Sequence, residues 1–288
     1  MPVDLQALSP KLIHLMLDTV FVVEGNNRII FVSNACEALL GYRPDELVGT
    51  MITDYMHPED LAATQASIHR VMSGEPHLDF RNRYIRKDGG VVHILWSAQW
   101  YEEEGVRVGV ARNVTALRQA EAELRFLAHH DPLTELPNRS LFHDRLDSAL
   151  RAAHRHRSGL ALLFLDVNDF KTINDDHGHA VGDRVLCAIA RRLEGCVRET
   201  DTLARMGGDE FIVLLTEIHS AEAVSRKVAQ IHVAMAEPPG PEFSGITMPS
   251  CSIGVACYPA DGEDADTLLS LADGDMYRMK RRRSASRH

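Results

Sequence analysis

The sequence has only five cysteines, no long apolar run and a deficit of positive charge. The cysteines are scattered and include no Cys-x-x-Cys pair, which argues against a disulfide framework or a zinc site and favours reduced thiols. No segment approaches the roughly 18–20 apolar residues that cross a bilayer. The N-terminus has no basic segment before its apolar stretch, so we expect no secretory signal and a cytoplasmic protein.

The charge balance restricts the class of partner. There are 41 acidic and 31 basic residues, a formal net charge of −10, which argues against broad binding to nucleic acid. We interpret the basic run from Lys280 to Arg283 as a solvated helix end. The 288 residues are enough for two domains, each with its own core.

Residues 20–112 contain short strand-like runs separated by turns. The runs 20–23 and 29–32 flank Gly25-Asn26-Asn27, which predicts a hairpin. The other elements expected here are two or three short helices within 35–74, two strands within 79–100 around a turn at 87–90, and a last strand at 106–111.

Residues 114–128 are rich in Ala, Glu, Arg and Leu, without Gly or Pro. Leu117, Ala120, Leu124 and Leu127 recur at spacings of three and four, which predicts a helix with one apolar stripe. The stripe suits a pair of helices from two chains, or one amphipathic helix lying on its own domain. The position between two domains favours a connector.

The second half contains continuous apolar runs at 160–165, 211–215 and 252–257. Such runs predict strands covered by helices on one or both faces, in an α/β layer arrangement.

Three acidic residues accompany the first two of these runs. Asp166 follows the first run, and Asp209 and Glu210 follow Gly207-Gly208, a pair that permits a tight turn. If the turn lies beside the first strand, the carboxylates converge and repel one another, and divalent cations that also carry phosphates resolve the repulsion. Taken alone, the same residues also suit a solvated hairpin and a helix cap.

The surrounding motifs make the pattern specific. Residues 128–283 resemble the GGDEF family of diguanylate cyclases, and Gly207 to Phe211 reproduce its signature letter for letter. The other matching segments, in order, are DPLTELPNR at 131–139, FLDVNDFKTIND at 164–175, HGH at 177–179, GD at 182–183, SIGVA at 252–256, AD at 272–273, MY at 276–277 and Lys280.

The resemblance implies a palm-like central antiparallel sheet flanked by helices, and an enzyme that condenses two GTP molecules into cyclic di-GMP. It implies Mg²⁺ or Mn²⁺ on Asp166, the Val167 carbonyl, Asp209 and Glu210, with Asp209 as a candidate base and Glu210 assisting. Because each domain binds one GTP, the resemblance also implies a homodimer.

Further roles follow from the same resemblance. Asn174 and Asp183 would bind guanine, and Lys171 and Lys280 would contact phosphates. The full substrate-binding set is Phe170, Lys171, Asn174, His179, Asp183, Gly207, Gly208 and Lys280.

A second set resembles the family's inhibitory product-binding site: Arg198 and Asp201, in an Arg-x-x-Asp pattern, with Arg205. The bare pattern also suits an ion pair on a helix. One departure is that Arg283-Ser284-Ala285 stand where the family has Gly-Arg-Asn, so the phosphate-binding Arg is missing from its usual place. Either one of Arg281 to Arg283 substitutes for it or GTP binding is weaker.

Residues 18–113 resemble a PAS sensor domain through Asn34, Gly41-Tyr42, HPED at 57–60, RKDGG at 86–90 and Trp96. Asn113 replaces the usual exit Asp, which removes a carboxylate that normally tethers the core to the outgoing helix. The Asn-Cys-Arg motif of flavin-binding PAS domains is absent, and Ala62 stands where haem-binding ones have His. We expect His69 to be a surface or structural residue. The sensed ligand stays open: an empty or small-ligand pocket, or a purely dimerising domain.

The sequence therefore predicts an α+β or α/β protein of three parts. These are a PAS domain with an N-terminal helix (1–113), a helical, coiled-coil-like connector (114–129) and a GGDEF domain (130–288). The hypothesis is a PAS-regulated, product-inhibited diguanylate cyclase. The alternative is a catalytically silent GGDEF domain that acts as a receptor for cyclic di-GMP or GTP.

Overall fold

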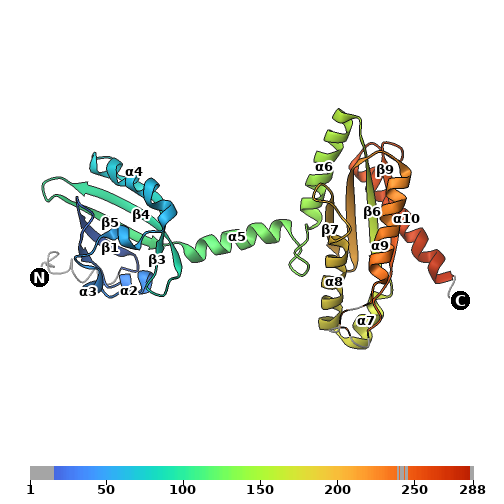
Figure 1. Cartoon of the computed structure of the whole chain (residues 1–288), viewed down its shortest axis with the longest axis horizontal. Coiled ribbons are helices and arrows are strands. Elements are labelled where there is room, and N and C mark those ends of the chain that lie inside the picture. Colours follow the sequence, from blue (N-terminus) through green and yellow to red (C-terminus); the bar gives the residue numbers. More distant parts are fainter. Residues whose placement is uncertain (1–15, 239, 241–242, 244–245, 286–288) are drawn as a thin grey trace, which may run out of the picture. The chain divides into compact units, whose positions relative to one another are not determined.

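A computed structural model describes residues 16–238, 240, 243 and 246–285, and the predicted N-terminal helix lies outside these residues. The chain divides into two compact units, and the division falls after Ala122, within helix α5 (Thr115–His129). Each unit has its own sheet (Figure 1).

The N-terminal unit has a five-stranded antiparallel sheet in the order β2-β1-β5-β4-β3. The strands are β1 (Thr19–Glu24), β2 (Ile29–Val32), β3 (His77–Ile85), β4 (Val91–Tyr101) and β5 (Val106–Asn113). The predicted hairpin and the three later strands are therefore confirmed.

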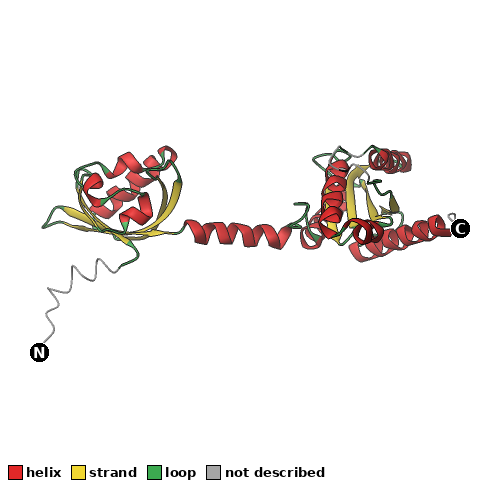
Figure 2. Cartoon of the chain, turned by 90° about the horizontal axis from the view of Figure 1, so that it is seen from below, coloured by secondary structure: helices red, strands yellow, loops and turns green. Residues whose placement is uncertain are grey.

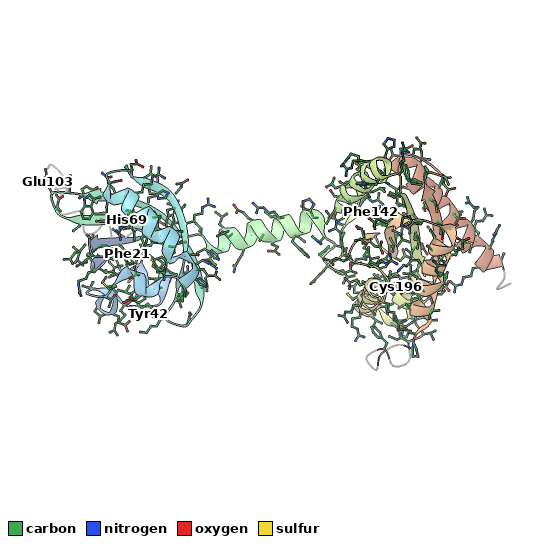
Figure 3. The ribbon with its side chains drawn as sticks, turned by 45° about the horizontal axis from the view of Figure 1, so that its top comes forward. Phe21, Tyr42, His69, Glu103, Phe142 and Cys196 are labelled. Carbon is green, nitrogen blue, oxygen red and sulfur yellow. The ribbon has the colours of Figure 1, made fainter. Side chains whose placement is uncertain are left out.

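Short helices cover one face of this sheet (Figure 2). They are α2 (Cys36–Leu40), α3 (Pro44–Leu47), the 3₁₀ turns η1 (Ile52–Tyr55) and η2 (Pro58–Asp60), and α4 (Leu61–Met72). Phe21, labelled in Figure 3, is fully buried, and its ring centroid lies 5.5 Å from that of Trp96 in a tilted arrangement; the Trp96 and Tyr84 ring centroids are 5.7 Å apart. This aromatic cluster forms the centre of the unit's core.

The exit from the unit keeps a polar connection although Asn113 replaces the usual Asp. The Asn113 side-chain oxygen accepts a hydrogen bond from the Thr115 N–H at 3.0 Å. The Thr115 hydroxyl in turn accepts one from the His93 N–H on β4 at 2.9 Å. A neutral side-chain oxygen therefore binds the first turn of α5, as Asn does at helix N-termini.

The C-terminal unit has a four-stranded antiparallel sheet in the order β7-β8-β6-β9. Its strands are β6 (Gly159–Val167), β7 (Thr202–Gly207), β8 (Glu210–Ile218) and β9 (Cys251–Tyr258). The three strands predicted from apolar runs are confirmed. Strand β7 was not predicted, because its sequence TLARMG contains no apolar run longer than two residues.

Strand β6 is buried on both faces, which explains why its apolar residues do not alternate with polar ones. Leu163 and Leu165 join a core with α8 (His179–Glu194) and α9 (Ala221–Ala236), whereas Leu162 and Phe164 join a core with α6 (Arg139–His156) and α10 (Ala265–Ala285). The unit is therefore an antiparallel sheet between two helical layers. None of the helices in the described part of the chain is both long and apolar enough for a membrane span.

Gly254 fixes the position of α10 on the sheet. A Cβ atom at Gly254 would lie 2.1 Å from the Ala272 carbonyl oxygen and 2.1 Å from the Met276 nitrogen, both in the α10 backbone. The helix therefore packs directly on the β9 backbone, an approach that only glycine permits. This contact places the last turns of α10 at the same end of the sheet as Asp166.

Candidate active site

The glycine pair forms the turn between β7 and β8. Gly207 and Glu210 pair across the two strands, so Gly208 and Asp209 form a two-residue turn. Gly207 has φ 132° and Gly208 has φ 54°, values that favour glycine. A Cβ atom on either residue would meet nothing within 4 Å. The glycines are therefore needed for the backbone conformation, and the space above them is open.

The turn lies beside the end of β6, which is the condition stated above for the three acidic residues to converge. Asp166 pairs with Glu210 in the β6–β8 ladder, and the Val167 N–H donates to the Asp209 carbonyl at 3.1 Å. The structure therefore brings the backbones of all three acidic residues to one end of the sheet.

Lys280, from α10, is the principal cation at this place. Its Nζ lies 2.7 Å from Asp166 Oδ1 and 2.8 Å from Oδ2, with hydrogen-bond geometry only to Oδ2. Burial raises the pKa of Asp166, Asp209 adds to the rise, and Lys280 opposes it. The ammonium group supplies positive charge to Asp166, whose side chain is only 8% exposed.

The negative charge of Glu210 is less compensated by nearby cations than that of Asp166. Burial raises its pKa, and the charges of Asp166, Asp209 and Asp273 raise it further, while Arg139 lowers it. A cluster of carboxylates with raised pKa values favours the binding of a cation.

The donor chemistry at this end of the sheet fits a hard divalent cation, because all candidate ligands are oxygen atoms. Within the described residues, however, no three His, Cys, Asp or Glu side chains converge closely enough to form a ready-made metal site. The structure brings the acidic residues together at one edge, and the cation that contacts Asp166 is the ammonium of Lys280.

The candidate guanine-binding residues lie on the two helices that follow β6. Asn174 belongs to α7 (Phe170–His177), and Asp183 belongs to α8 beside Gly182. A Cβ atom at Gly182 would lie 1.9 Å from Asn174 Oδ1, so glycine is needed for this side chain to keep its position. The Oδ1 atom is buried and has no hydrogen-bond partner within the described residues.

The other candidate substrate residues are divided between solvent and core. Lys171, His179 and Asp183 are exposed. Phe170 is half-buried, and its side chain packs against the main core.

Arg198 and Asp201 lie between α8 and β7, and they do not form an ion pair with each other. The Asp201 carboxylate accepts hydrogen bonds from the backbone N–H groups of Arg198 at 3.0 Å and Thr216 at 3.3 Å. Arg198 is exposed. Together with Arg226 and Lys227, the two residues line a cavity of about 230 Å³. The cavity is therefore bordered by three cationic side chains.

Arg205, which the resemblance assigned to the product-binding set, is not among the residues lining this cavity, and its actual contacts were not predicted from the sequence. Its Nη1 donates to Asp131 Oδ1 at 2.8 Å, and its Nε and Nη2 donate to the Gly208 carbonyl at 3.1 and 2.7 Å. Only 10% of the side chain is exposed. Arg205 therefore connects the glycine turn to the segment before α6. The only available signal was that Asp131 begins one of the matched motifs.

Arg283 stands one residue before Ser284, the position at which the phosphate-binding Arg was expected. Its Nη2 lies 3.1 Å from Asp169 Oδ2 in the loop between β6 and α7. An arginine near the end of α10 therefore reaches the substrate segment.

Comparisons with known proteins find a family match for each of the two units. Residues 128–286 match the family described as "Diguanylate cyclase, GGDEF domain", and residues 29–111 match the PAS fold. Diguanylate cyclase TpbB of Pseudomonas aeruginosa is 45% identical over 171 residues, which cover 59% of this chain and 39% of TpbB. The chain thus spans well under half the length of this relative.

Two solved structures are similar to the C-terminal part. The GGDEF domain of TpbB shares 46% identity at a TM-score of 0.52, covering 54% of this chain and 90% of that one. The coiled coil and GGDEF domain of DgcB from Caulobacter crescentus, in complex with c-di-GMP, shares 28% identity at a TM-score of 0.52, covering 58% of this chain and 88% of that one. Because the family match includes the whole β6–β9 sheet, its acidic turn and more than half of the chain, the protein belongs to the GGDEF-domain family of diguanylate cyclases and has a PAS fold in front of that domain.

Proposed function

We propose that this chain is an active diguanylate cyclase that joins two GTP molecules into cyclic di-GMP and releases two pyrophosphates. The observation that carries the proposal is the intact glycine turn, which places Asp209 beside the end of β6 and Asp166. The name of the similar TpbB, a diguanylate cyclase, supports it.

In the proposed reaction, the 3′-oxygen of each GTP attacks the α-phosphorus of the other, and the bond to pyrophosphate breaks. The 3′-hydroxyl proton leaves to a base, for which Asp209 is the candidate. Asn174 and Asp183 bind and orient guanine, and Lys171 contacts phosphates. The open surface over Gly207 and Gly208 lets the phosphates approach the backbone.

Asp166, Asp209, Glu210 and the Val167 carbonyl are the groups proposed to hold Mg²⁺ or Mn²⁺. When bound, the metal neutralises charge on the phosphate oxygens and lowers the pKa of the attacking hydroxyl. Lys280 then exchanges its contact with Asp166 for one with a phosphate. The raised pKa values of Asp166 and Glu210 support this assignment, because added positive charge relieves their repulsion.

A homodimer is part of the proposal, because one domain with one GTP makes no product. Helix α5 buries none of its residues in the single chain. Leu117, Leu124 and Leu127 are 59%, 67% and 44% exposed, and the three leucines lie on one side of the helix. We propose that a second copy of α5 covers this stripe and that the PAS unit adjusts the geometry of the pair.

Feedback by product is also proposed, at the cavity bordered by Arg198, Arg226 and Lys227. Arginine binds phosphate through two parallel N–H donors. The carboxylate of Asp201 already holds the loop by its backbone, so the exposed guanidinium of Arg198 is left to contact a ligand.

The first test is direct. Purified protein with GTP and Mg²⁺ should form cyclic di-GMP, detected by chromatography, and Asp209→Ala should lower the rate by on the order of 10²- to 10⁴-fold. The control is Asp147→Ala, which changes an exposed carboxylate on α6. Binding of GTP without turnover by the wild-type protein would instead support the silent receptor.

The second prediction concerns the charge of Glu210. Its pKa is raised on folding, so its carboxylate costs folding free energy that grows as the pH rises through the folded-state pKa. Without metal at pH 7, Glu210→Gln should raise the Tm by roughly 1–4 °C. The difference should shrink as the pH falls toward about 4.3, the ordinary pKa of Glu.

The control for this measurement is Glu217→Gln, an exposed position on the same strand, which should leave the Tm unchanged. Added Mg²⁺ should raise the Tm of the wild type more than that of Glu210→Gln. A metal-free Tm for Glu210→Gln at or below the wild-type value would contradict the repulsion.

The third prediction concerns feedback. Arg198→Ala should raise the inhibition constant for cyclic di-GMP by roughly 10- to 100-fold, because one charge-assisted contact is lost, and the initial rate should change little. The control is Arg191→Ala, an exposed arginine on α8. Equal inhibition constants for Arg198→Ala and wild type would rule out this site.

The fourth prediction concerns assembly. Leu124→Glu would bury a charge between the two α5 helices, at a cost of several kcal/mol. Light scattering should then show dimers only at higher protein concentration. Activity per protomer should rise with protein concentration in parallel with the dimer fraction. Ala122→Glu, on the opposite side of α5, is the matched control. Specific activity of Leu124→Glu that matches the wild type at all dilutions would exclude this dimer.

A further inference from the structure

The N-terminal unit contains a cavity that none of the proposed activity uses. It lies between the sheet and α4, with a volume of about 40 Å³, more than the roughly 10–15 Å³ needed for one water molecule. Its walls are mainly apolar and aromatic and include Phe21, Val71, Tyr84, Trp96 and Ala98. His69 is exposed on α4 and is not among the lining residues.

One charged side chain faces this cavity. Arg107, Gly109 and Ala111 are the buried residues of β5, and their alternation places Arg107 on the inner face of the sheet. Arg107 is 7% exposed and lines the cavity. A Cβ atom at Gly109 would press on the Trp96 ring at 3.2 Å, so this glycine lets the ring lie close to β5 at the cavity wall.

The guanidinium group of Arg107 is only partly compensated. Its Nη2 donates to Asn27 Oδ1 at 3.1 Å, whereas its Nη1 is buried without a hydrogen-bond partner in the part of the chain that the structure describes. Neither Asp nor Glu is among the residues lining the cavity. Burial lowers the pKa of Arg107, and Tyr84 opposes this effect.

The neutral polar groups around the cavity are already paired. Asn82 accepts from the Trp96 indole N–H at 2.9 Å and donates to the Thr64 hydroxyl at 3.0 Å. Ser67 Oγ and His77 Nδ1 lie 2.7 Å apart. Among the described lining residues, Arg107 alone has a buried side-chain nitrogen or oxygen atom without a partner.

A buried cation without a counter-charge is unfavourable, and an anion that enters the cavity relieves the cost. Arginine favours carboxylates because its parallel N–H donors match the two oxygens. The apolar remainder of the wall suits a short hydrocarbon chain. We propose that this cavity binds a short-chain monocarboxylate, with its carboxylate on Arg107 and its hydrocarbon part against the aromatic wall.

The test is calorimetric titration of the full chain with acetate, propionate and butyrate, together with Tm measurements over the same concentrations. At least one carboxylate should bind saturably and raise the Tm by mass action. Propionamide, which lacks the charge, and sodium chloride at matched ionic strength should neither bind saturably nor raise the Tm. Absence of saturable binding by all three carboxylates, or equal stabilisation by chloride or propionamide, would overturn the proposal.

Two variants locate the site. Arg107→Met should weaken carboxylate binding by roughly 10- to 100-fold, the effect of losing hydrogen bonds to a charged group. Its ligand-free Tm should equal or exceed the wild-type value, because an uncompensated buried charge is removed. Arg81→Met, at an exposed position on β3, is the matched control and should keep wild-type affinity.

Ala98→Leu fills the cavity while Arg107 remains, and it should also abolish binding. This variant decides the question if Arg107→Met does not fold. Unchanged carboxylate affinity in a folded Arg107→Met or in Ala98→Leu would show that the anion binds elsewhere and would overturn the assignment.

Discussion

The charge of Asp166 requires compensation, because this residue is only 6% exposed at the end of a strand buried on both faces. Strand β8 adds to the requirement by pairing Glu210 with Asp166 and by placing the Asp209 backbone against Val167. Positive charge comes from α10, whose Lys280 reaches the carboxylate because the helix backbone packs directly on Gly254. The packing of α10 and the electrostatics of the acidic edge therefore depend on each other.

The turn that carries Asp209 is fixed by Arg205. Arg205 binds the Gly208 carbonyl and Asp131 at the same time, so the residues before α6 limit the movement of a turn whose other side is open. Glycine supplies the conformation and arginine supplies the rigidity. A ligand that contacts this backbone benefits from both, because a mobile turn would lose conformational entropy when the ligand binds.

The two units contain buried charges of opposite sign. Asp166 in the C-terminal unit has a lysine partner and acidic neighbours, whereas Arg107 in the N-terminal unit has an amide partner and an apolar cavity. The first arrangement favours cations that accompany phosphates, and the second favours a small anion. Strand β5, which contains Arg107, continues into α5 through the Asn113 and Thr115 hydrogen bonds. A ligand on Arg107 therefore contacts the strand that leads into the proposed dimer helix.

The sequence by itself determined the features that depend on neighbouring residues. Apolar runs predicted β6, β8 and β9, the glycine pair predicted the tight turn, and the matched motifs predicted the family. Strand β7 was not predicted because Arg205 interrupts its apolar residues, so no apolar run in it is longer than two residues. Tertiary structure alone decided that Lys280 contacts Asp166 across 114 positions and that Arg205 contacts Asp131 across 74. It also decided that Arg107 faces a cavity without a carboxylate. Strand periodicity and turn conformation are short-range properties of the chain, whereas the partner of a buried charge depends on which distant elements pack against it.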